Sequence, residues 1–128
     1  MINREQAVRL YSELSRRTQE GAIQWVRVGQ AEVSGWRGDA LNDSFIAKYN
    51  NWRLGLLRIG IRRYDGERDV HYWEEDVRLV LLNSMDRVEF EFPEAPGLSD
   101  LLGSVTYMTS NAADFVADIL GGNKPKAK

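Results

Sequence analysis

Residues 44–63 read SFIAKYNNWRLGLLRIGIRR, in which two alternating runs of apolar and polar side chains flank an Asn-Asn pair. Successive side chains of a strand point to opposite faces, so the alternation predicts strands over 44–49 and 52–63. Asn50 and Asn51 between them tolerate the positive φ angles of a two-residue turn. The segment therefore predicts an antiparallel hairpin.

The longer of these two runs changes its apolar phase at Leu56 and Leu57. A β-bulge at that step would turn both apolar sets toward one core. Gly55 and Gly60 would make the bend easier, because a glycine weakens the regular strand. We therefore expect a bulge in this strand.

Further strands are indicated on both sides of the hairpin. An alternating run over 23–28 precedes it, and Tyr64-Asp65-Gly66 after it predicts a second turn. Residues 77–82 are apolar almost throughout, as in the centre of a sheet. Residues 87–92 alternate, and the side chains that we expect to point inward are Val88, Phe90 and Phe92. Strands joined by short turns predict an antiparallel meander.

Helical periodicity marks both ends of the chain. Residues 4–20 carry apolar side chains at spacings of three and four. Asn3 and Gln6 suit a capping box at the start, and Gly21 suits the left-handed end of a helix. We therefore expect an N-terminal helix with one narrow apolar face.

Residues 98–120 hold the helical period over a broader apolar stripe. Thr109-Ser110-Asn111 offers a capping sequence inside it, so the segment forms either one helix or two helices at an angle. A helix of this length needs docking for its stability. We therefore expect the whole stripe, Phe115 and Ile119 included, to cover one face of the sheet.

The element order is thus a helix, about five strands and a helical segment. An antiparallel meander with helices on one face is an α+β fold of two layers. We expect a single domain over 1–122. A flexible basic tail follows over 123–128, because its lysines have no apolar neighbour to hold them.

Composition limits the functional classes. The 128 residues are 43% hydrophobic and 28% charged, as in a globular domain, and carry a formal charge of −2. That charge provides no general attraction to nucleic acid or anionic lipid. The absence of cysteine excludes disulfides, thiolate metal sites and a cysteine nucleophile. We expect a soluble cytoplasmic protein with no membrane segment, no cofactor and no bound metal.

One basic cluster is a candidate ligand site. Arg58 and Arg62 share a strand face, and Trp52 and Tyr64 bracket them. Arginines beside aromatic rings bind nucleotides or single-stranded nucleic acid in some sheet proteins. Alternatively, the arginines pair with acidic side chains across a hairpin, with residue 62 or 63 near 67 or 69. Both interpretations stay open at this point.

Four tryptophans are many for a chain of this size. Trp25 and Trp52 fit strand positions, and we expect both in the core. Trp36 lies beside Arg37 in a glycine-rich connection over 29–43, and Trp73 lies in a polar stretch. Tryptophan and arginine are enriched where binding energy concentrates, so these three residues are candidates for partner binding. A tryptophan that folds back onto the core is the alternative.

The single histidine, His71, is expected to be a turn or strand residue. A catalytic base needs an orienting partner and a proton to take, and no nucleophile motif lies nearby. Six carboxylates lie within 65–76. They lack the glycine and the distal glutamate of a calcium loop, so we interpret this segment as a solvated loop.

The junction of the first helix and the first strand carries Thr18, Gly21, Ile23 and Trp25 in a Thr-x-x-Gly-x-Ile-x-Trp pattern. In this motif the chain resembles a loose group of small uncharacterised bacterial and phage proteins. In that group a meander and a C-terminal helical segment follow the motif. The resemblance implies the same α+β fold and no particular activity.

The leading hypothesis is a non-enzymatic protein-binding module that acts through a sheet edge or an aromatic loop. An inhibitor or immunity-type protein of a mobile element would be one example, and a homodimer through an exposed edge is compatible with it. The alternative is a small-ligand or nucleotide-binding protein that uses Trp52, Arg58, Arg62 and Tyr64. Neither a membrane nor nucleic acid is expected as a partner.

Overall fold

The computed structural model describes residues 1–28 and 43–121, which form a five-stranded sheet and three helices. The elements are α1 (Arg4–Gln19), β1 (Trp25–Val28), β2 (Ser44–Tyr49), β3 (Trp52–Asp65), β4 (Val70–Leu82), β5 (Val88–Glu91), α2 (Leu98–Thr109) and α3 (Ala112–Leu120). Each strand pairs antiparallel with the next, in the order β1-β2-β3-β4-β5. The predicted meander and the α+β class are confirmed. The expected tail over 123–128 lies outside the described residues.

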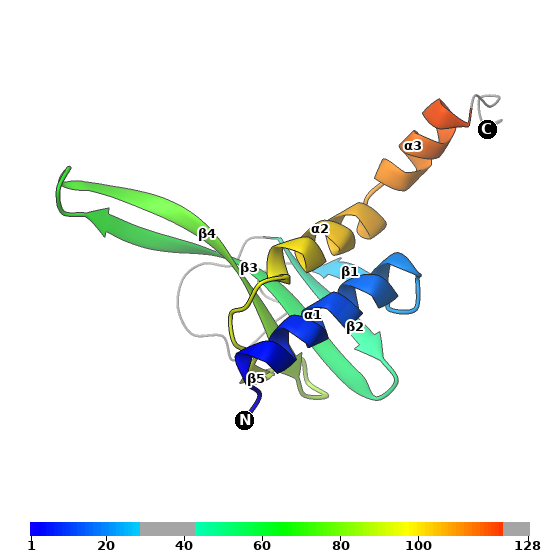
Figure 1. The fold of residues 1–128 in the computed structure, drawn as a ribbon, viewed down its shortest axis with the longest axis horizontal. Coiled ribbons are helices and arrows are strands. Elements are labelled where there is room, and N and C mark those ends of the chain that lie inside the picture. Colours follow the sequence, from blue (N-terminus) through cyan, green and yellow to red (C-terminus); the bar gives the residue numbers. More distant parts are fainter. Residues whose placement is uncertain (29–42, 122–128) are drawn as a thin grey trace.

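The helices α1 and α2 lie side by side over one face of the sheet (Figure 1), which we call the helix face. The larger apolar core lies between these helices and the sheet. Its buried side chains come from both helices and from four strands, and they include Tyr11, Phe45, Leu56, Leu79 and Leu101. Burial of this apolar surface is the main stabilising contribution to the fold.

The helix α1 begins and ends where the sequence indicates. Asn3 and Gln6 form the two hydrogen bonds of a capping box, at 2.8 and 3.0 Å, and Gly21 adopts a φ of +78° just after the helix. The buried Thr18 hydroxyl donates to a backbone carbonyl one turn earlier and accepts from Nε1 of Trp25 at 3.0 Å. Trp25 therefore lies in the core, as expected, with its polar atom paired.

The bulge expected at Leu56 and Leu57 is wrong. The strand β3 pairs with β4 in unbroken register from Arg53 to Asp65. Leu56 therefore faces the helices, whereas Leu57 points to the opposite face. There it belongs to a second buried cluster, which consists of Ile46, Leu57, Ile59, Val80 and Leu82. The change of apolar phase marks a strand that is buried on both faces rather than a bend in it.

A register shift lies instead at Leu81 and Leu82, where β4 pairs with β5. Val88 consequently packs against the second cluster, while Phe92 packs against the larger core on the helix face. Phe90 is exposed, and its ring meets that of Phe92 edge to face with centroids 5.1 Å apart. The expectation that all three apolar residues of this run share one inward face is therefore wrong.

The strands β3 and β4 extend far beyond their other neighbours. The pairing of β2 with β3 stops at Leu56, and that of β5 with β4 stops at Val80. Among the described residues, 59–65 and 70–76 therefore pair only with each other. Figure 1 shows them as a two-stranded ribbon that projects from the molecule, and we call this ribbon the arm. The sequence placed only a loop over most of 67–76.

The helix α3 does not cover the sheet. The extended backbone of Ser110 separates it from α2, and Figure 1 shows it projecting away from the core. None of its residues is buried, and Phe115 and Ile119 are 66% and 62% exposed. The segment thus forms two helices, and the expectation that the stripe covers the sheet along its whole length is wrong. Of these two C-terminal helices, only α2 supplies buried side chains to the core.

The contrast between α2 and α3 gives a test by stability. We expect Leu101→Ala in α2 to lower the free energy of unfolding by about 2–5 kcal/mol, because it opens a cavity in a fully buried site. Phe115→Ala in α3 is the matched control and should change that free energy by less than about 0.5 kcal/mol. Urea denaturation of both variants measures the difference. Equal losses would show that α3 packs on the domain after all.

The buried Tyr11 predicts a loss of stability at high pH. Its hydroxyl donates to the Pro93 carbonyl. Burial, with the charges of Glu91 and Glu94 adding to it, raises the pKa of Tyr11 from 10.0 to about 12. The folded state therefore holds this proton more tightly than the unfolded state, and the free energy of unfolding should fall as the pH rises from 10.0 to about 12. In Tyr11→Phe this fall should be smaller, as chemical denaturation across that pH range would measure.

Candidate functional site

The arm carries aromatic side chains on a face that continues the helix face of the sheet. Cross-strand register places Arg62 opposite Trp73 and Tyr64 opposite His71, and alternation puts all four side chains on the same side. The rings of Tyr64 and His71 have centroids 4.9 Å apart. Trp73 is 66% exposed, and Tyr64 is exposed as well. We call these four residues the aromatic face of the arm.

Ion pairs cross the two strands of the arm. Arg58 Nη2 lies 2.9 Å from Glu75 Oε2, and Arg63 Nε lies 2.9 Å from Glu74 Oε2. The Arg63 pair is about half exposed, and the Arg58 pair has an exposed carboxylate, so each pair stabilises the arm only weakly. Arg62 forms no ion pair with any residue that the structure describes. On the same face the Tyr64 hydroxyl donates to the Asp69 carboxylate at 2.7 Å, so an acidic group also lies beside the aromatic rings.

At the base of the arm, Arg78 is surrounded by three carboxylates and is only 16% exposed. Its guanidinium lies 2.6 Å from Asp76, 3.0 Å from Glu91 and 2.7 Å from Glu94. Burial opposes the charge on Arg78, but these carboxylates outweigh it and raise the pKa of the guanidinium. This cluster links β4, β5 and the segment before α2 where the ribbon leaves the sheet.

The residues proposed as a ligand site do not come together. Trp52 and Tyr64 lie at opposite ends of β3, which separates them by roughly 40 Å along the strand. The buried residues from Leu54 to Leu57 lie between Trp52 and Arg58. Trp52 was also expected in the core, which is wrong. It is 60% exposed, because it directly follows the turn at the end of the sheet.

The arginines do pair across a hairpin, but with other acids than expected. The partners are Glu74 and Glu75 on β4, and Arg62 itself is free of them. The sequence assigned these acids to a solvated loop, whereas they belong to a strand whose two faces are both exposed. His71 is a strand residue, as expected.

Of the three residues suggested for partner binding, Trp73 lies on the aromatic face of the arm. Trp36 and Arg37 lie outside the described residues. Across the residues that the structure describes, no group of three histidine, aspartate or glutamate side chains is placed to hold a metal ion. None of the described helices is long and apolar enough to cross a membrane.

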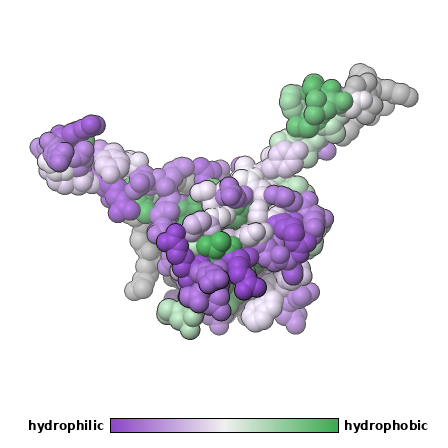
Figure 2. Space-filling model, viewed as in Figure 1, coloured by the Kyte–Doolittle hydropathy of each residue, from purple (hydrophilic) through white to green (hydrophobic). Residues whose placement is uncertain are grey.

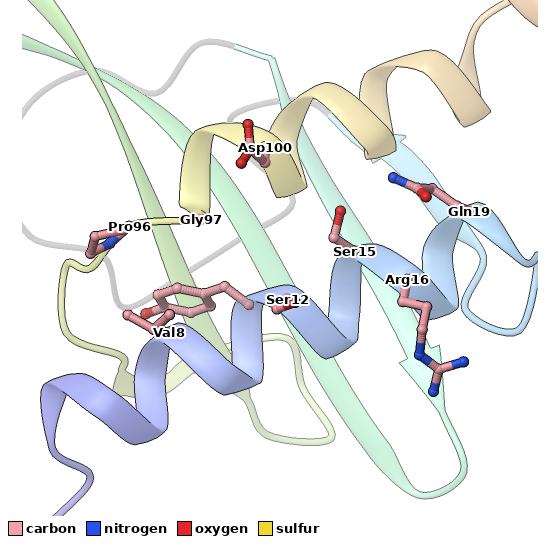
Figure 3. A pocket seen from close by; sticks show the side chains of 9 residues that line it. Val8, Ser12, Ser15, Arg16, Gln19, Pro96, Gly97 and Asp100 are labelled. Atoms are coloured by element: carbon pink, nitrogen blue, oxygen red, sulfur yellow. The ribbon is translucent and has the colours of Figure 1, made fainter.

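A groove of about 470 Å³ separates α1 from α2 (Figure 3). Its walls combine apolar surface, including Val8 and Tyr11, with polar side chains, including Ser12 and Ser15 on the α1 side and Asp100 on the α2 side. Arg16 points away from α2 in Figure 3, and its guanidinium is bound by Glu13 and Glu20.

The exposed apolar face of α3 is the surface that sequence reasoning missed. Figure 2 shows it as a hydrophobic patch at the end of a projection. Its exposed side chains are Phe115, Val116, Ile119 and Leu120. The break at Thr109-Ser110-Asn111 was a signal for it, because a second short helix at an angle to the first need not follow the sheet.

Comparisons of this chain with protein-family models, with curated proteins and with solved structures found no match. The resemblance at the Thr-x-x-Gly-x-Ile-x-Trp motif therefore stays a prediction.

The Arg78 cluster gives a test of how the arm is held. In Arg78→Met three carboxylates lose their common cation, and we expect a loss of about 1–3 kcal/mol in the free energy of unfolding at neutral pH. The pKa of Asp76, which burial raises, is held below 3.8 by the Val77 amide and by Arg78. The wild-type contribution is therefore present above pH 3.8 and is lost as the pH falls below it, so the two proteins should converge in acid.

Hydrogen exchange provides the second readout of this variant. Amides of residues 70–76 should exchange faster in Arg78→Met than in wild type, because the base of the arm is loosened. Arg63→Met is the control, since it removes an exposed pair on the same arm and should have a smaller effect. If both variants behave alike, the cluster does not anchor the arm.

Proposed function

We propose that this chain is a non-enzymatic protein-binding module and that the arm is its recognition element. The observation that carries the proposal is the exposed two-stranded ribbon with aromatic side chains on it. A two-stranded ribbon alone is marginally stable in water, so a partner that packs on it gains from ordering it. Exposed apolar surface on a projecting element is typical of interaction sites.

The arm offers a protein two kinds of contact. Among the described residues, the outer edges of 59–65 and 70–76 pair with no other strand, so their outward N–H and C=O groups are free to bind an added strand. Tyr64, Tyr72 and Trp73 supply large, rigid contact area. The first kind gives affinity through the backbone, and the second gives specificity through side chains.

The alternative, a nucleotide site on the arginines of β3, has less support. Such a site needs arginines that are free to approach phosphate. Arg58 is held by Glu75, and Trp52 lies too far away to stack on a base bound beside Tyr64. The more specific hypothesis of an inhibitor or immunity-type protein of a mobile element rests on size and layout alone.

Paired tryptophan substitutions test the proposal. Trp73 and Trp52 have similar exposure and lie in the same pair of strands, but only Trp73 is on the arm. We expect Trp73→Ala to abolish capture of a partner by the full chain in a pull-down from source cells. Once that partner is identified, calorimetry should show a loss of about 2 kcal/mol or more in binding. Trp52→Ala should bind as wild type, and both variants should keep the wild-type melting temperature.

Equal binding by wild type and Trp73→Ala would contradict the arm as recognition element. Equal losses in Trp73→Ala and Trp52→Ala would also contradict it, because the effect would then not be specific to the arm.

A further inference from the structure

A hydrogen bond near the base of the arm shows which backbone groups of β4 point away from β3. The amide of Phe92, directly after β5, donates to the carbonyl of Leu79 at 2.9 Å, so Leu79 directs its backbone groups away from β3. Successive residues of a strand direct these groups to alternate sides. Because the register with β3 is unbroken, the backbone groups of His71, Trp73 and Glu75 also point away from β3. We call this side of 71–75 the outer edge of β4.

Side chains close this edge at the position next to the sheet. The Val77 amide donates to Oδ1 of Asp76 at 2.8 Å, and the Val77 carbonyl accepts from Nη1 of Arg78 at 3.1 Å. Both backbone groups of Val77 are thus paired without a neighbouring strand. Farther along the arm, no strand in the described part of the chain lies beside 71–75. The outer edge of β4 is therefore open over 71–75.

The arm with its turn carries the net negative charge of the chain. Of the 19 carboxylates and 17 basic side chains, residues 59–76 hold six and three, which leaves 13 and 14 elsewhere. The charge is concentrated on the second strand, because 69–77 contains four carboxylates and neither lysine nor arginine. Opposite charges on adjacent strands stabilise their pairing, and like charges oppose it. The outer edge of β4 therefore favours a basic neighbour.

Two of these carboxylates keep an oxygen for a further partner. Glu74 and Glu75 each bind an arginine of β3 through Oε2, at 2.9 Å. Among the described residues, no hydrogen bond engages Oε1 of either glutamate. Their side chains are 53% and 61% exposed. An added strand would lie on the side of β4 away from those arginines, so a cation on it can approach both glutamates without displacing the existing pairs.

We propose that an extended, basic segment of a partner protein adds to the outer edge of β4 as a further strand. Its backbone pairs with the outward groups of His71, Trp73 and Glu75. Its lysine or arginine side chains lie beside Glu74 and Glu75. The exposed ring of Trp73 offers such a side chain a cation–π contact. The proposal rests on the proposed function, since it names the kind of partner that the arm recognises.

Charge disfavours the other occupants of the arm. A second copy that offered the same edge would bring carboxylates against carboxylates, and these repel each other. Phosphates of a nucleic acid would meet the same repulsion. The opposite edge of the arm carries Arg58 and Arg62, but Glu75 already binds Arg58. The net negative charge of 59–76 also repels the acidic segment that these arginines would attract.

Selection from a phage-displayed library of random peptides of about ten residues tests the partner chemistry. We expect the full chain to enrich peptides rich in lysine and arginine. Glu74→Gln with Glu75→Gln should weaken binding of the most enriched peptide about tenfold. Glu5→Gln with Asp118→Asn is the matched control, because it changes the net charge equally but away from the arm, and it should bind as wild type.

Three outcomes of this selection would overturn the proposal. The first is enrichment of acidic or uncharged peptides, and the second is enrichment of no peptide. The third is an equal loss of binding in the two double variants, because the attraction would then come from the net charge of the whole chain.

Hydrogen exchange measured by NMR locates the bound peptide. With the most enriched peptide bound, the amides of His71, Trp73 and Glu75 should exchange about tenfold more slowly or less. The amides of Tyr72 and Glu74 point toward β3 and should change less, since that strand already pairs with them. Protection that alternates along β4 in this way is specific to an added strand.

The opposite edge provides the contrary outcome. Gly60 and Arg62 lie opposite Glu75 and Trp73 in the register, so their amides point to the other side of the arm. Slower exchange at these two amides in place of the β4 amides would overturn the proposal, and so would protection at neither edge.

A proline provides a test that leaves every carboxylate in place. His71→Pro removes one outward N–H, and a strand tolerates proline where the N–H points away from the sheet. It should weaken peptide binding about tenfold. His71→Ala is the control, because it removes the same ring but keeps the amide, and it should bind as wild type. Equal binding by the two variants would overturn pairing through the backbone.

The results separate this proposal from the proposed function. Suppose that Trp73→Ala loses a partner protein in the pull-down, but that Glu74→Gln with Glu75→Gln binds this partner as wild type does. The arm is then the recognition element, and the basic segment is wrong. If instead Trp73→Ala keeps every captured protein while basic peptides protect the outer edge of β4, the edge binds such segments and the role of Trp73 in the proposed function is wrong.

Discussion

The unbroken antiparallel pairing of β3 with β4 determines the rest of this structure. Thirteen consecutive residues from Arg53 to Asp65 have partners in β4, and no bulge interrupts them. Strict alternation therefore extends along the whole ribbon and assigns each side chain to one face. From Leu54 to Leu57 both faces of β3 are buried, the helix face under α1 and α2. Beyond Ile59 the same alternation continues where the neighbouring strands have ended, so both faces become exposed.

Within a few residues of β3 and β4, buried apolar side chains give way to charged side chains. On one side of this change, Leu57 and Val80 are completely buried. On the other, Arg58 and Glu75 form an exposed pair, and between the two regions Arg78 holds three carboxylates. If the side chains of such a cluster move apart, its stabilising contribution is largely lost, because charges of low exposure are left without a partner. Such a cluster fixes the direction in which the arm leaves the sheet.

The sequence predicted which residues form helices and turns better than it predicted which side chains are buried. Local signals sufficed for the capping box at Asn3, the turn at Asn50-Asn51 and the end of α1 at Gly21, because each depends on a few adjacent residues. The strands of the arm were not predicted, because their side chains are exposed on both faces and the acidic residues of β4 have the polar composition of a loop. Trp73 was nevertheless proposed for partner binding, from its residue type alone.

The exposed helix illustrates the limit of periodicity. An amphipathic pattern shows that a helix has an apolar side, but it does not say which molecule covers that side. For α2 the cover is the sheet, and for α3 no surface of the same described chain provides one. A continuous helix through Ser110 would have carried Phe115 straight on from α2, whereas the extended residue redirects the chain. An exposed apolar face that is separated from the core in this way buries no side chain against the described part of the chain, so it contributes little hydrophobic stabilisation to the fold.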